Sequence, residues 1–447
     1  MSKRNALETE NITKLFFKFA IPSIFGMLIV SLEIMIDGMF LGRNVGPLGL
    51  AAVNLSMPLI NFLMSVGLMI CVGGGVITSI YFGKKKLNKA RELTSITLML
   101  LIGVLEFLSL IVLFNLDFFI NFLGANEEVY PYVRAYMIPM MIGAFFYTSP
   151  IFTETFVKIE EKPNLVFVSG SVCLTFNALL DYLFIQKFQW GMVGGATATL
   201  LACMFGFLAL LPNLHFKLPQ KSLRIYIKDI KNIFFNGSSE MLSVVSSTFA
   251  MYLFNLTLMK KIGVLGVSAL TIVFYINQML NISLYGLSQA LQPLVAYNLG
   301  ARHLDKIKKV LRVSLITGGA LGAVAYIGSH IWGSFIIGIF SKGNQELMSL
   351  AKTALFYISF AYLISFLNII STSFLTSIEK PIESVVVSLG RSIVFIAIPL
   401  FILPDLIGAK GIWLSIPIAE LMCLVVSYFL MKKAIAQITW RLTKKLK

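Results

Sequence analysis

Two pairs of polar side chains stand four residues apart inside long apolar stretches of the sequence. Asn177 and Asp181 lie in FNALLDYLFI, and Glu33 and Asp37 lie in SLEIMIDGMFLG. A spacing of four residues places both members of a pair on one face of a helix. Acidic groups inside apolar helices are costly unless they face a partner or a cavity, so these two faces are the first candidates for function.

The stretch that follows Asp181, GMVGGATATLLACM, adds two hydroxyls, Thr197 and Thr199, which point to different sides of a helix. One of them is placed to turn toward Asp181. Carboxylate, amide and hydroxyl oxygens without thiolate or imidazole suit an alkali cation or a proton, not a transition metal. The alternative is that Asn177 and Asp181 only hold helices together, as polar side chains in membrane bundles often do.

Further polar groups occupy other apolar stretches. Each carboxylate costs about 3 kcal/mol at the centre of a membrane helix. We expect Glu106 to form an interhelical hydrogen bond and Arg391 to reach the lipid headgroups. Capping or packing roles remain open for Glu240 and Glu420. The candidates for lining a substrate cavity are Glu33, Glu240, Gln289, Gln292, Tyr297 and Glu420.

The elements that must position these groups are membrane helices. The 447 residues are 57% hydrophobic and 13% charged, whereas soluble domains are about 25% charged. Apolar runs of roughly 20 residues or more, long enough to cross a bilayer, are separated by short charged clusters. Twelve spans are predicted, at 14–41, 48–81, 92–123, 129–157, 164–186, 191–214, 232–259, 265–298, 310–340, 347–377, 382–403 and 409–431.

The basic residues predict the orientation of these spans. With twelve spans, all but eight of the 37 Lys and Arg residues fall on one side. The positive-inside rule places that side, and both termini, in the cytoplasm. The net charge of +16 is therefore a signal of topology, and no nucleic-acid partner is expected. The eight on the other side are Arg43, Arg134, Lys187, Lys260, Lys261, Lys342, Lys352 and Lys410.

The two halves of the chain repeat each other. LGLAAVNLSMPLINFL from Leu48 parallels LGVSALTIVFYINQML from Leu265, and EKP recurs at 161–163 and 379–381. Each half holds six spans, an even number, so the repeats are parallel. The predicted domains are an N-terminal lobe (1–214), a cytoplasmic linker (215–231) and a C-terminal lobe (232–447).

The repeat also compares the polar groups of the two halves. It sets Asp37 against Phe254 and Asp181 against Pro399. Gly191 falls opposite Gly411, which sets Thr199 against Ala419. The counterparts are apolar, so the shared scaffold does not require these polar groups. The cluster belongs to one lobe only.

Several chemistries are absent from the sequence. It contains no phosphate-binding G-x-x-x-x-G-K-[ST] motif and no catalytic constellation, so neither ATP hydrolysis nor an enzyme is predicted. The four cysteines lie in apolar runs and are expected to be buried packing residues. No cofactor and no transition-metal site are expected.

Taken together, several stretches resemble the multidrug and toxic compound extrusion (MATE) family. They are IDGMFLGR, FNALLDYLFI with GMVGGATAT, GLSQALQPLVAYNLGA, and the run from LGRSIVFIAIPL to SIPIAE. The resemblance extends over nearly the whole chain. It is greatest to the bacterial DinF- and MepA-like branch, which carries an Asp-Gly pair in the first span, here at 37–38.

That resemblance implies a fold of two six-helix lobes arranged as a V and an antiporter driven by inward H⁺ or Na⁺. It further implies a cation site formed by Asp37, Asn177, Asp181 and Thr199, which selects Thr199 over Thr197. Glu33 departs from the pattern, because an uncharged residue is more usual there. Ser239 also departs, since many relatives have Pro. The extra charge of Glu33 leaves the coupling ion open.

The predicted function is therefore export of cationic or amphiphilic organic compounds in exchange for H⁺ or Na⁺. The expected location is the bacterial cytoplasmic membrane, as a multi-pass monomer, since one chain supplies both lobes. A lipid-linked-oligosaccharide flippase of the same superfamily is one alternative, although it would need a cavity rich in Lys and Arg. An ion channel is the other, and it would need a continuous polar pore.

Overall fold

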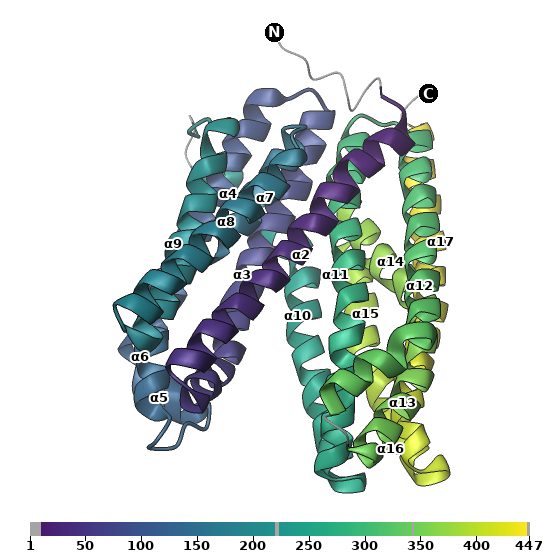
Figure 1. The fold of residues 1–447 in the computed structure, drawn as a ribbon. Coiled ribbons are helices and arrows are strands. Elements are labelled where there is room, and N and C mark those ends of the chain that lie inside the picture. Colours follow the sequence, from purple (N-terminus) through teal and green to yellow (C-terminus); the bar gives the residue numbers. More distant parts are fainter. Residues whose placement is uncertain (1–9, 220–222, 342–343, 445–447) are drawn as a thin grey trace. The chain divides into compact units, whose positions relative to one another are not determined.

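A computed structural model describes residues 10–219, 223–341 and 344–444 of the chain. These residues are almost entirely helical and contain no strand. The chain divides into two compact units, built mainly from Phe17–Gly237 and from Ser238–Lys447. Each unit is described by itself below, and Figure 1 shows the helices of both.

The first unit holds the helices of the first half of the chain and the start of the next helix. Within it, α8 packs along α9, and α7 contacts both (Figure 1). The elements are α2 (Ile12–Asn44), α3 (Pro47–Gly83), α4 (Leu87–Phe114), α5 (Leu116–Phe122), α6 (Tyr130–Ile142), α7 (Ala144–Ile159), α8 (Asn164–Asp181), the π-helix η1 (Tyr182–Lys187), α9 (Gly191–Leu210), η2 (Leu211–Asn213) and η3 (Leu223–Tyr226).

The second unit contains the helices of the second half. Its core is apolar and is built around the fully buried Trp413. The elements are α10 (Ile227–Lys261), which begins in the first unit, α11 (Val264–Gly300), α12 (Leu304–Ser341), α13 (Gln345–Ser359), η4 (Phe360–Leu363), α14 (Ser365–Ser377), α15 (Pro381–Leu389), the π-helix η5 (Gly390–Val394), α16 (Phe395–Ile407) and α17 (Ala409–Lys444).

The helices account for all twelve predicted spans. Ten are long and apolar enough to cross a membrane. Two bent pairs bring the number to twelve if each pair is one span: α6 with α7, bent by 52°, and α13–η4 with α14, bent by 43°. These pairs are the predicted spans 129–157 and 347–377. The prediction of a twelve-helix, all-α membrane protein is thus confirmed, and two of the spans are bent.

Unusual backbone conformations recur at a nearly constant interval. Residues with positive φ include Gly46 and Gly263, Lys85 and Arg302, Glu161 and Glu379, and Gly191 and Gly408. Three of these pairs are 217 residues apart and the fourth 218. Non-glycine residues adopt this conformation uncommonly, so its recurrence at Lys85/Arg302 and Glu161/Glu379 shows that both halves make the same turns.

This repeat corrects one part of the sequence alignment. Gly408, and not Gly411, shares the positive φ of Gly191. Ala419 is therefore not the counterpart of Thr199, which at the interval of 217 falls against Ile416. The interval of 220 residues that set Gly191 against Gly411 is therefore three residues too long at this turn. The counterpart remains apolar, so the polar cluster still has no equivalent in the other half.

The first turns of α10 pack closely on α3 within the first unit. A Cβ built on Gly73 would lie 2.0 Å from the carbonyl oxygen of Ile233, and one on Gly237 would lie 1.9 Å from that of Met69. Real Cβ atoms do not approach other atoms so closely. The two backbones therefore touch through a pair of glycines, a contact that membrane helices commonly use.

The segment before α10 is held against the first unit by charged and aromatic groups. The Tyr226 hydroxyl donates to Glu92 Oε2 (2.6 Å), and Lys89 Nζ lies 2.7 Å from Asp229 Oδ2 and 3.9 Å from the centre of the Tyr226 ring. Burial, and then the Glu92 carboxylate, raise the pKa of Tyr226 to about 12. The phenol therefore stays protonated as a donor. Part of the predicted linker, 220–222, lies outside the described residues.

Candidate functional site

Asp37 on α2 is the centre of a hydrogen-bonded cluster in the first unit. Asn177 Nδ2, from α8, donates to Asp37 Oδ1 at 2.7 Å. Thr199 Oγ1, from α9, lies 3.2 Å from Asp37 Oδ2 and 3.0 Å from the carbonyl of Gly195. A hydroxyl has one proton, so Asp37 and the helix backbone share this donor. Three helices meet at one carboxylate.

Asp181 ends α8 beside this cluster. It is completely buried, and its carboxyl group lies next to that of Asp37. Within the described parts of the chain, neither of its oxygens accepts a hydrogen bond, and neither does Asn177 Oδ1. The π-helix η1 starts at the following residue, and π-turns inside helices are frequent at functional sites.

Three buried oxygens without a donor are unfavourable unless something supplies positive charge. Leaving a buried polar atom unpaired costs about 1–3 kcal/mol, and more for a charged group. A cation bound by Asp181 and the Asn177 carbonyl would remove this cost. So would a proton on Asp181, because the neighbouring Asp37 is an acceptor. These oxygen atoms therefore suit a proton or an alkali cation.

The comparison of Thr199 with Thr197 agrees with the choice made from the family pattern. Thr197 is exposed and donates to the backbone oxygen of Val193. Thr199 is buried and reaches Asp37. The structure therefore brings together Asp37, Asn177 and Thr199, with Asp181 beside them.

Other groups of the first unit surround the cluster. Glu33 is buried one turn before Asp37 and interacts electrostatically with Asp37 and with Glu154 on α7. Tyr136 on α6 is buried and lies within the electrostatic range of Asp37 and Asp181. Sequence reasoning missed Glu154 and Tyr136, although Glu154 is an acidic residue within the predicted fourth span.

The second unit contains a different polar arrangement. Gln292 Nε2 on α11 donates to Glu240 Oε1 on α10 at 2.8 Å. The structure brings these two candidates together, a contact that the sequence did not predict. Gln289 and Tyr297 are not among the residues that line the small cavity beside Glu240, whereas Ser388 and Arg391 are.

Glu420 belongs to a buried network. Arg391 Nε donates to Glu420 Oε1 at 2.7 Å, and Asn368 Nδ2 donates to Glu420 Oε2 at 2.7 Å. The Ser427 hydroxyl donates to Asn368 Oδ1 at 2.8 Å. The prediction that Arg391 reaches the headgroups is wrong, because a carboxylate from α17 compensates its charge inside the unit. Glu420 was predicted to line a cavity, but its partner Arg391, and not Glu420, lines the small cavity beside Glu240.

Glu106 and the cysteines are also placed. Glu106 on α4 is partly exposed and lies near the backbone of Phe145. The four cysteines are buried and unpaired, as expected for packing residues. The described residues contain no group of His, Cys, Asp and Glu that could bind a transition metal.

Comparison with known proteins places this chain in a family. The MatE family model matches residues 22–183 and 240–402, once in each half. The multidrug export protein MepA of Staphylococcus saprophyticus is 24% identical over 429 residues, covering 93% of this chain and 92% of that protein. MepA of Staphylococcus haemolyticus is 24% identical over 432 residues, covering 95% and 94%.

Solved structures show the same fold. A MATE crystal structure in complex with MaL6 has a TM-score of 0.91 at 18% identity, covering 98% of this chain and all of that one. A MOP superfamily transporter from Pyrococcus furiosus, whose reversed pocket polarity suggests a different function, has a TM-score of 0.90 at 19% identity, covering 98% and 99%. With both halves matching the family model and the fold shared over nearly the full length, the chain belongs to the MatE family of membrane transporters.

Proposed function

We propose that the protein exports cationic and amphiphilic organic compounds in exchange for H⁺ or Na⁺ that enters the cell. The observation that carries the proposal is the cluster of Asp37, Asn177 and Thr199 with the unpaired, buried Asp181 beside it. No structural need of the repeated scaffold explains the cluster, because the second half has apolar residues at the corresponding positions. The name of the MepA relatives, multidrug export protein, supports the substrate class.

The coupling ion would act by being bound differently in two states of the transporter. A proton or Na⁺ at Asp37 and Asp181 shifts the equilibrium only by the difference in its affinity for those states. Because α2, α8 and α9 all contribute to the site, a small movement of any of them changes that affinity. Linkage then requires that the organic substrate and the ion alter each other's binding by the same factor.

The electrostatics of the first unit favour a positively charged substrate. Glu33, Asp37, Glu154 and Asp181 lie near one another. The buried Lys158 on α7, one turn after Glu154, offsets only part of this negative charge. The ion and a cationic substrate would therefore compete for the same negative potential. We propose that this competition couples uptake of the ion to release of the substrate.

The flippase alternative gains no support from the cavity beside Glu240. A pyrophosphate headgroup would need uncompensated Arg or Lys side chains there, and Arg391, the basic residue that lines this cavity, is matched by Glu420 at 2.7 Å. The channel alternative gains no support from either unit taken by itself.

Efflux of a fluorescent lipophilic cation from proteoliposomes tests the proposal, with Na⁺ and pH gradients imposed separately. We expect one gradient to drive efflux in the wild type, and Asp37→Asn and Asp181→Asn each to lower the driven rate at least about tenfold, since each removes a buried charge from the site. Glu106→Gln, which removes a carboxylate elsewhere in the same unit, is the matched control and should transport normally. Full gradient-driven efflux by both Asp variants would contradict the proposal.

A further inference from the structure

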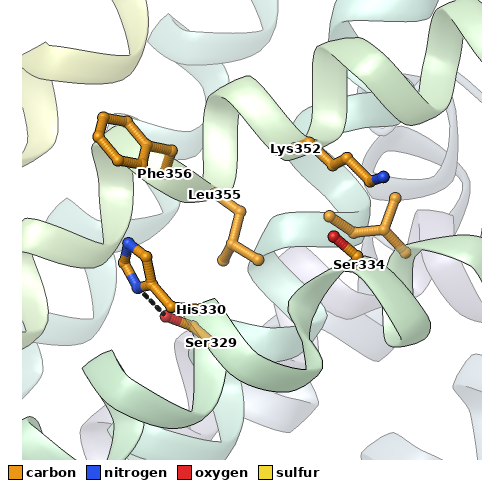
Figure 2. A pocket seen from close by; sticks show the side chains of 7 residues that line it. Ser329, His330, Ser334, Lys352, Leu355 and Phe356 are labelled. Atoms are coloured by element: carbon orange, nitrogen blue, oxygen red, sulfur yellow. Dashed lines mark hydrogen bonds between the residues drawn. The ribbon is translucent and has the colours of Figure 1, made fainter.

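A pocket of about 150 Å³ opens between α12 and α13 in the second unit, away from the polar clusters described above. Four polar side chains line it: Ser329, His330 and Ser334 from α12 and Lys352 from α13. Leu355 and Phe356 form its apolar wall. Figure 2 shows the Lys352 ammonium on the Ser334 side of the pocket and His330 across Leu355 from it.

Lys352 brings an uncompensated positive charge to this pocket. Its side chain is exposed, and the ion pairs of the second unit in the described ranges involve other basic residues. A lysine on an apolar surface extends its ammonium toward a polar environment. In this position the ammonium is available to an anionic ligand.

His330 has one ring nitrogen engaged and one directed elsewhere. Its Nδ1 lies 2.9 Å from the carbonyl oxygen of Tyr326, and its ring packs on Tyr326 and Phe356. A carbonyl can only accept a hydrogen bond, so Nδ1 carries a proton. Nδ1 also lies 3.4 Å from Ser329 Oγ, so Ser329 and His330 together form one polar edge of the pocket (Figure 2).

The depth of the pocket corresponds to the boundary between hydrocarbon and headgroups. α12 has 38 residues, or about 57 Å, against a hydrocarbon thickness of about 30 Å. Its charged residues all lie at its start and end at Arg312, so the roughly 20 residues that cross the hydrocarbon after it reach Trp332. Ser334 precedes the end of α12 by seven residues, and Lys352 follows the start of α13 by seven, about 10 Å in each case.

The surface around the pocket suits acyl chains. Ile331, Trp332 and Phe335 on α12 are 61%, 60% and 71% exposed, and they stand on a membrane helix where lipid is the neighbour. Tryptophan is enriched at this depth of a bilayer. The occupant must therefore be amphiphilic, with an anionic polar group for the pocket and apolar chains for its rim.

We propose that this pocket binds the phosphate headgroup of an anionic phospholipid. Lys352 and Ser334 bind the phosphate oxygens, and His330 and Ser329 lie at the opposite end, next to the remainder of the headgroup. The acyl chains lie along Ile331, Trp332 and Phe335. The distribution of Lys and Arg assigns this end of the helices to the outer leaflet. The proposal is independent of the coupling site.

Lipid-dependent thermal unfolding of the purified, delipidated full chain in detergent tests this site. Dioctanoyl phosphatidylglycerol is the probe, with dioctanoyl phosphatidylcholine and inorganic phosphate in parallel. We expect a saturable rise in the melting temperature with phosphatidylglycerol alone. Lys352→Gln should weaken the affinity roughly tenfold, the effect of losing one hydrogen bond to a charged group.

Two variants control for nonspecific effects. Lys410→Gln removes an exposed lysine predicted on the same side of the membrane and should leave the affinity unchanged, whereas Lys352→Arg keeps the charge and should retain most of it. Equal affinity of Lys352→Gln and wild type would overturn the proposal. So would an equal response to phosphatidylcholine, or displacement of the lipid by inorganic phosphate, which would make this a site for a free anion.

Discussion

Thr197 and Thr199, two residues apart on α9, have different surroundings. Thr199 reaches Asp37, and Thr197 bonds only to its own helix in the described structure. We expect Thr199→Val to weaken the apparent affinity for the driving ion about fivefold, because one hydrogen bond contributes about 1 kcal/mol. Thr197→Val should leave it unchanged. Initial rates of efflux at increasing driving-ion concentration measure this difference, and equal effects of the two substitutions would remove Thr199 from the site.

The Arg391–Glu420 pair makes a prediction about stability. Removal of one partner of a buried ion pair typically costs about 3–5 kcal/mol, because the other charge is left buried and unpaired. Arg391→Met should therefore destabilise the protein by about that amount, and adding Glu420→Met should recover much of the loss. Reversible unfolding in mixed micelles, arranged as a double-mutant cycle, gives the coupling energy.

A coupling energy near zero would show that the two charges do not depend on each other. Asn368 would still donate to a remaining Glu420, so the cycle should be repeated with Asn368→Leu. We expect that variant to enlarge the effect of Arg391→Met, since Glu420 would then lose both of its side-chain donors.

At the scale of elements, the contact between α3 and α10 depends on glycine. Gly73→Ala would bring a Cβ to 2.0 Å from a backbone oxygen, and overpacking of this kind costs about 1–3 kcal/mol. Gly103→Ala on α4, where nothing lies within 4 Å, is the matched control and should be neutral or stabilising, since Ala is the better helix former by about 1 kcal/mol. Melting temperatures in detergent compare the two. If Gly73→Ala is no less stable than Gly103→Ala, the two helices do not depend on this close approach.

The sequence predicted the elements better than their interruptions. Apolar length alone located all twelve spans, because crossing a bilayer requires about 20 residues. The bends after Ile142 and near Ile364 were not predicted. Pro139 and Gly143 are a signal that could have located the first bend, whereas the proline-free segment around Ile364 offers none. The helix ends were also underestimated: α17 continues to Lys444, thirteen residues past the predicted span, because its polar last turns extend beyond the lipid.

For the candidate sites, the sequence likewise predicted the polar residues better than their partners. Asp37, Asn177 and Asp181 could be found from the sequence because acidic and amide groups in apolar helices are costly, and the family pattern selected Thr199. The partner of Arg391 could not be found from the sequence, because Arg391 and Glu420 are 29 residues apart and lie on different helices. Helical spacing reports contacts within a helix, and contacts between helices depend on how the helices rotate and pack.

At the scale of the whole molecule, the charge distribution predicts that both termini are cytoplasmic. A fluorescent-protein fusion at Lys447 should fluoresce, and an alkaline phosphatase fusion there should be inactive. A phosphatase inserted after Gly124, in the predicted outer loop between α5 and α6, should be active. Phosphatase activity at the C-terminus would reverse the orientation, and would place the proposed phospholipid pocket in the inner leaflet.

The left-handed turns that recur at an interval of 217 or 218 residues indicate that the two halves have a common origin. They are best explained by duplication of an ancestral chain of six spans that functioned beside a second copy of itself. Two identical copies must carry the same side chains, so both would have held an ion or neither would. After duplication the two halves were no longer bound to the same side chains, and they now differ: the first half has a buried acid without a hydrogen-bond donor, and the second pairs an acid with an arginine. The asymmetry on which the proposed exchange depends is thus a product of their divergence.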